Sequence, residues 1–132
     1  MGFSYQIIPV SESVRDQQFF NWLDSWEVTY PQEFSLGRYP TVDELKDSLE
    51  GLENCTVRFY PRIQKAEIVF ADYTSEFTFR QNSNGEIEHL SFRNGDYVMV
   101  KQAVQAFANR CGTFLMMIEG EDPELIFPDL AK

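Results

Sequence analysis

The most reactive side chains in this sequence are one histidine, His89, and two cysteines, Cys55 and Cys111. Strict alternation along the strand predicted around His89 places Glu86 and Glu88 on the opposite face from the imidazole. We therefore interpret His89 as an ordinary sheet histidine and predict no catalytic residue. The alternative is a hydrolase or transferase that uses His89 with Glu86 or Glu88.

The two cysteines show neither the spacing of a metal site nor the density of a disulfide-rich secreted domain. Cys111 falls at the end of a predicted helix, where the helix dipole disfavours a thiolate. We interpret both as buried thiols rather than as a disulfide. The sequence predicts no metal site and no cofactor.

A short acidic run, Glu119-Gly120-Glu121-Asp122, invites comparison with a calcium site. It lacks the alternating oxygen ligands and the distal bidentate glutamate of a known calcium loop. We therefore expect a solvated acidic turn there. No glycine-rich sequence follows a predicted strand and opens a helix, so a nucleotide-binding loop is not predicted.

The chain carries 21 acidic and 11 basic side chains, a net charge of −10, yet 43% of it is hydrophobic and 15% aromatic. That apolar content can offset the entropy of folding, so an acidic folded domain is predicted. The only close basic groups are Arg58, Arg62 and Lys65, which disfavours direct binding to nucleic acid or to an anionic membrane. The charge favours a basic protein partner. Alternatively, it only keeps the protein soluble.

Residues 26–40 form a long segment with no sustained helix or strand period, and such segments in small domains are often functional. The segment is rich in the aromatic residues that dominate protein interfaces, and it leads into an acidic helix. We predict a partner-binding surface made of Trp26, Tyr30, Phe34, Tyr39, Asp43, Glu44, Asp47 and Glu50. The alternative is that the aromatic rings pack over the core as an ordered arm.

Hydrophobic periodicity and turn residues predict the order of the elements. A first strand over 3–10 contains Pro9, which suits an edge or terminal strand. Helices are predicted over 13–26, from Thr41 to about Gly51, and from Asn94-Gly95-Asp96 to Gly112. The second of these is predicted to open with a capping box, because Glu44 follows Thr41 by three residues. Four strands form a meander between the last two helices, and a buried strand follows; their ranges are 55–60, 65–72, 76–80, 86–92 and 113–118. Ile87 breaks the alternation, so a bulge is expected there, and the tail after 118 is expected to be mostly irregular.

This order predicts one α+β domain over 1–132, with a mainly antiparallel sheet. The sheet consists of the four-strand meander plus N- and C-terminal strands, and about three helices pack against it. No apolar run approaches the length of about 20 residues that spans a bilayer, and the first ten residues do not resemble a secretory signal. We therefore expect a cytoplasmic protein with no membrane contact.

The charge, the size and the missing catalytic motifs favour a small acidic protein-binding domain. Its predicted role is that of an inhibitor or immunity-type protein, of the kind bacteria use against basic nuclease toxins or phages use against nucleic-acid-binding complexes. One alternative is a secretion-type chaperone or adaptor, which would form a homodimer and hold a client segment. Another is a small-ligand-binding module with a pocket between helix and sheet.

Overall fold

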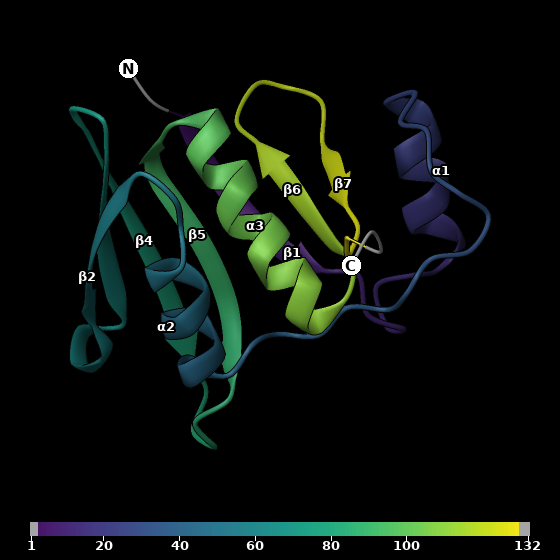
Figure 1. Ribbon diagram of the computed structural model, residues 1–132. Coiled ribbons are helices and arrows are strands. Elements are labelled where there is room, and N and C mark those ends of the chain that lie inside the picture. The colour runs from purple at the N-terminus through teal and green to yellow at the C-terminus, as the bar shows by residue number, and fades with distance from the viewer. Residues whose placement is uncertain (1–2, 130–132) are drawn as a thin grey trace.

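The computed structural model describes residues 3–129 (Figure 1). The described helices are α1 (Gln17–Ser25), α2 (Val42–Glu50), the 3-10 helix η1 (Pro61–Ile63) and α3 (Tyr97–Cys111). The strands are β1 (Phe3–Pro9), β2 (Cys55–Tyr60), β3 (Lys65–Phe70), β4 (Tyr73–Gln81), β5 (Ile87–Gly95), β6 (Phe114–Ile118) and β7 (Glu124–Ile126). They form one 7-stranded sheet in the order β2-β3-β4-β5-β1-β6-β7, and every pair is antiparallel. The predicted α+β class with a mainly antiparallel sheet is confirmed.

The predicted meander is formed by β2 to β5, whose residues alternate between the core and solvent. Tight turns join its strands: Gln64 adopts a left-handed conformation after η1, and Gly85 has φ 81° in the turn between β4 and β5. The expected bulge is present beside Ile87, because the register shifts between Arg80 and Gln81.

Strand β1 lies in the interior of the sheet, between β5 and β6, so the predicted edge position is wrong. The proline that suggested an edge is the last residue of the strand. The next residue, Val10, donates its backbone N–H to the carbonyl of Thr113, so the missing donor of Pro9 does not interrupt the pairing. The tail is also more regular than expected, since it contains β7.

The ends of the helices follow local capping rules. The Asp16 side chain accepts from the Phe19 N–H, so α1 begins at Gln17 and is shorter than the predicted 13–26. Helix α2 has the predicted capping box between Thr41 and Glu44, and it ends at Gly51. In α3, Asp96 caps the start and Gly112, at φ 99°, ends the helix.

The two faces of the sheet bury different cores. On one face, α2 and α3 cover the sheet (Figure 1), and the Phe107 ring of α3 contacts the rings of Phe77 and Phe114. Alternation turns the neighbouring Leu115 to the other face, where it packs with Leu23 of α1 in a second cluster. Helix α1 therefore lies on the opposite side of the sheet from α2 and α3.

Within the described residues, no helix is long and apolar enough to cross a membrane. Cys55 and Cys111 are free thiols, as predicted. Cys111 is buried, but Cys55 is only partly buried, so the expectation that both are buried holds for Cys111 alone.

Candidate functional site

The eight residues of the predicted binding surface fall into two groups on opposite faces of the sheet. Trp26, Tyr30 and Phe34 lie on the same side of the sheet as α1. Tyr30 and Phe34 pack against the second core cluster. Tyr39 packs against the first cluster, beside α2. The acidic residues Asp43, Glu44, Asp47 and Glu50 all belong to α2. The structure thus brings Tyr39 to the acidic helix and keeps the other three aromatic residues away from it.

The segment between α1 and α2 packs as an ordered arm over the α1 face of the sheet. The Phe20 ring lies 5.2 Å from the Tyr30 ring and 6.4 Å from the Phe34 ring, measured between centroids. Phe34 also contacts Phe127, at 5.6 Å. Among the aromatic residues of the arm, Trp26 is the most exposed, at 42%. Tyr30 and Phe34 are therefore half-buried and pack against the second core cluster, as in the ordered-arm alternative.

A close backbone contact fixes the end of this arm. The Gly37 N–H donates to the Val10 carbonyl, and the Arg38 N–H donates to the Cys111 carbonyl. A Cβ atom on Gly37 would lie 2.0 Å from the Thr113 carbonyl oxygen, and one on Gly112 would lie 2.0 Å from the Leu36 carbonyl oxygen. Only glycine allows the two chains to approach this closely. The contact sets the position of Tyr39 and of the start of α2.

The exposed side of α2 and the turn after it carry four carboxylates, Asp43, Asp47, Glu50 and Glu53. We call this group the α2 acidic face. Lys46 is the basic residue among them, and its ammonium group pairs with Glu50 at 3.0 Å. The hydrogen bond to Glu50 raises the pKa of Lys46, and the nearby Asp47 and Asp43 raise it further. The local potential around α2 is therefore negative.

Glu44 has a structural role that sets it apart from the other acidic residues of α2. Both of its oxygens accept from the Arg38 guanidinium, each at 2.8 Å, and one also accepts from the Thr41 N–H. The Arg38 hydrogen bonds lower the pKa of Glu44 to about 2. Burial, followed by the charge of Glu44, raises the pKa of the neighbouring Cys111 thiol to about 11. Glu44 is thus occupied by internal contacts, and Cys111 stays a thiol at neutral pH.

A pocket of about 500 Å³ lies beside the start of α2. The segment from Arg38 to Val42 forms one wall, and the turn between β4 and β5, including Asn84 and Glu86, forms the other. Tyr39 is half-buried at this pocket, and burial raises its pKa. The pocket places Glu86 beside the start of α2, a proximity that local sequence patterns did not predict.

Basic side chains gather on the face of the meander that turns away from α2 and α3. The register aligns Arg58, Glu67, Glu76 and Arg93 in one row across four strands. Lys65 pairs with Glu76 at 2.9 Å, and Arg80 pairs with Glu88 at 3.1 Å. Four of the basic residues thus lie on this side of the sheet, and they do not neutralise α2.

The bulge changes the surroundings of His89 from those predicted. His89 faces Arg80 across the β4–β5 pair, and the Arg80 guanidinium binds Glu88. Strict alternation would place Glu88 on the face opposite His89. In the structure Glu88 instead lies on the same face as Arg80 and His89. The prediction that no carboxylate shares the face of His89 is therefore wrong. Among residues 3–129, no group of three or more histidine, cysteine or acidic side chains is arranged to hold a metal ion.

Comparisons with protein-family models, with curated proteins and with solved structures found no match to this chain.

Proposed function

We propose that this chain is a small protein-binding domain that recognises a basic partner through the α2 acidic face, as an inhibitor or immunity-type protein does. The distribution of charge carries the proposal. Asp43, Asp47 and Glu53 form no ion pair with any described residue, whereas Lys65, Arg80 and Arg93 are paired on the far side of the sheet. Such a surface attracts a basic protein and speeds its encounter.

The pocket beside the start of α2 offers a partner a concave surface next to these charges. Its half-buried Tyr39 and the apolar side chain of Val42 offer an anchor position beside the carboxylates. A protein interface commonly combines a central anchor with a polar rim. We also propose a cytoplasmic location, which is supported by the two free thiols.

The test is affinity capture from a lysate of the native host with two matched variants. The first, Asp43→Asn with Asp47→Asn and Glu53→Gln, removes three charges from the α2 acidic face. The second, Glu12→Gln with Glu27→Gln and Glu33→Gln, removes three exposed charges from other parts of the chain. Both variants change the net charge equally, so they separate a local surface from a general effect.

We expect one basic protein to bind the wild-type chain and the second variant, to be lost from the first, and to elute as salt screens the charges. Equal binding to both variants would contradict the proposal. A homodimer that holds a client at high salt would instead favour the chaperone or adaptor alternative.

A further inference from the structure

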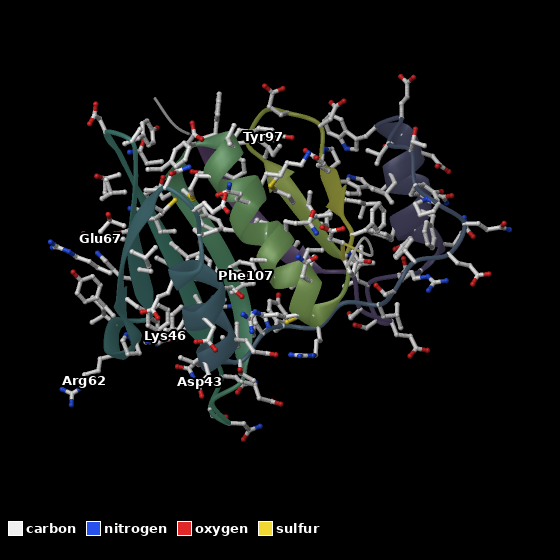
Figure 2. All side chains as sticks on the ribbon, viewed as in Figure 1. Asp43, Lys46, Arg62, Glu67, Tyr97 and Phe107 are labelled. Carbon is white, nitrogen blue, oxygen red and sulfur yellow. The ribbon has the colours of Figure 1, made fainter. Side chains whose placement is uncertain are left out.

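A second pocket lies between the start of α3 and the turn that joins β6 to β7. Its volume is about 380 Å³, and its walls include three aromatic rings, Phe3, Tyr5 and Tyr97, and three carboxylates, Glu121, Asp122 and Glu124. Figure 2 shows Tyr97 at the top of the molecule and Asp43 at the bottom, so this pocket is separate from the α2 acidic face. The acidic run noted in the sequence is an exposed turn, as expected, and two of its carboxylates, Glu121 and Asp122, line this pocket.

The Tyr5 side chain is the unusual member of this pocket. It is 1% exposed, and its hydroxyl group has no hydrogen-bond partner among the described residues. Leaving a buried polar group unpaired destabilises the folded protein. Burial, and next the nearby Asp96, raise the pKa of Tyr5, so the hydroxyl is neutral. Tyr5 is one of the residues that line the pocket, so a ligand seated there is a group that could supply the missing hydrogen bond.

The pocket wall already holds one cation. The Lys101 ammonium lies 2.7 Å from a Glu124 oxygen and 5.7 Å from the centre of the Tyr97 ring. The Tyr97 hydroxyl donates to the other Glu124 oxygen. A carboxylate and an aromatic face together are the surroundings that an alkylammonium group prefers.

The other two carboxylates of the pocket have no such cation. Glu121 and Asp122 are exposed, and neither forms an ion pair with a described residue. Lys101 neutralises Glu124, so Glu121 and Asp122 leave the pocket with a net negative charge. A hard metal ion such as Ca²⁺ takes six to eight oxygen ligands, so a pocket with aromatic walls suits an organic cation better.

We propose that this pocket binds an organic cation with a primary ammonium group. Its N–H groups donate to Glu121 and Asp122 and to the Tyr5 hydroxyl oxygen, and its alkyl chain lies against the rings of Phe3 and Tyr97. Both a free polyamine and the lysine side chain of a protein carry this group. The proposal does not depend on the function assigned to α2.

The binding test is a titration followed by two-dimensional NMR of the labelled full chain. The probes are spermidine, N-acetyl-lysine N-methylamide, and the neutral N-acetyl-norleucine N-methylamide. We expect saturable shifts of the backbone amides of residues 97–101, 118–122 and 124 with the cations and none with the neutral probe. Stronger binding of spermidine identifies a free amine as the ligand, and stronger binding of the lysine derivative identifies a protein side chain. Absence of shifts with both cations, or displacement of spermidine by CaCl₂, overturns the proposal.

Two variants locate the binding site. Glu121→Gln with Asp122→Asn should lower the affinity for the cation at least about 10-fold, which is the usual contribution of charge-assisted hydrogen bonds. Tyr5→Phe should lower the affinity for the cation about 3-fold. It should leave the melting temperature of the protein unchanged or higher, because the hydroxyl lacks a partner in the free protein.

The matched control is Glu12→Gln with Glu33→Gln, which removes the same charge from exposed positions outside both the pocket and the α2 acidic face. We expect this control to keep the affinity for the cation within about 2-fold. An equal loss in both double variants would show attraction by net charge alone and would overturn the proposal. A lower melting temperature for Tyr5→Phe would show that the hydroxyl already has a partner within the fold, and would overturn its role as a ligand contact.

Discussion

Single residues divide here into those that hold the fold and those that remain free to bind. Glu44 and Asp43 are neighbours on α2, yet Glu44 is held by Arg38 and Thr41 whereas Asp43 is exposed and forms no ion pair with a described residue. The sequence predicted the capping role of Glu44 from its spacing to Thr41 and also placed it in the binding surface. The structure favours the capping role, because the Glu44 oxygens already accept from Arg38 and Thr41. The contact with Arg38 depends on the path of the chain, which residue spacing does not reveal.

Glu44→Gln should lower the free energy of unfolding by about 1 kcal/mol, since the partner Arg38 is half exposed and water screens the pair. The native pKa of about 2 lies below the ordinary value of 4.5, so the pair stabilises the fold fully above that value. The stabilisation disappears as the pH falls toward 2. Urea unfolding at several pH values measures both effects.

The control for this prediction is Glu53→Gln, which removes an exposed carboxylate that forms no ion pair with a described residue. We expect it to leave the stability and its pH dependence nearly unchanged. The same acid dependence in wild type and Glu44→Gln would contradict the role given to Glu44.

Phe34 tests whether the arm is packed. Phe34→Ala removes ring contacts with Phe20 and Phe127 and should cost about 2 kcal/mol of unfolding free energy. Tyr30→Phe removes only an exposed hydrogen bond to Asp24 and should cost less than about 0.5 kcal/mol. Denaturant unfolding compares the two. A stable Phe34→Ala protein would show that the ring is free to bind a partner.

At the scale of elements, local signals placed the elements well but did not reveal how they assemble. The ends of α2 and α3 were predictable, because the signals that set them act within a few residues. These signals are the capping box at Thr41, the N-cap at Asp96 and Gly112 after the end of α3. The interior position of β1 depends on pairing with β5 and β6, which lie far along the chain. Likewise, α1 and α2 are joined by one segment yet lie on opposite faces, and this separation divided the predicted binding surface.

The contact between the arm and the end of α3 makes a prediction for Gly37. Gly37→Ala places a methyl group against the Thr113 carbonyl, so the arm must move, and we expect a loss of about 3 kcal/mol. Gly51→Ala is the matched control, because its new Cβ atom meets nothing closer than 3.3 Å. Calorimetry gives the two melting temperatures. Similar values would show that the arm is not held at Gly37.

For the whole molecule, the net charge of −10 implies self-repulsion that the described ion pairs do not remove. Added salt screens exposed carboxylates over about 10 Å at 0.1 M. We therefore expect the melting temperature to rise by about 2–5 °C between low ionic strength and 0.15 M NaCl. Scanning calorimetry across a salt series measures this. A falling melting temperature would mean that attractive pairs dominate.

The interior position of β1 also has a consequence for the order of folding during synthesis. This strand leaves the ribosome before the other six described strands, yet its neighbours are β5 and β6, so its backbone groups remain without sheet partners until both of those strands have been made. The hairpins of β2 to β5 depend only on near neighbours and can close earlier. We therefore expect the meander to form before β1 docks, although β1 is made before the strands of the meander.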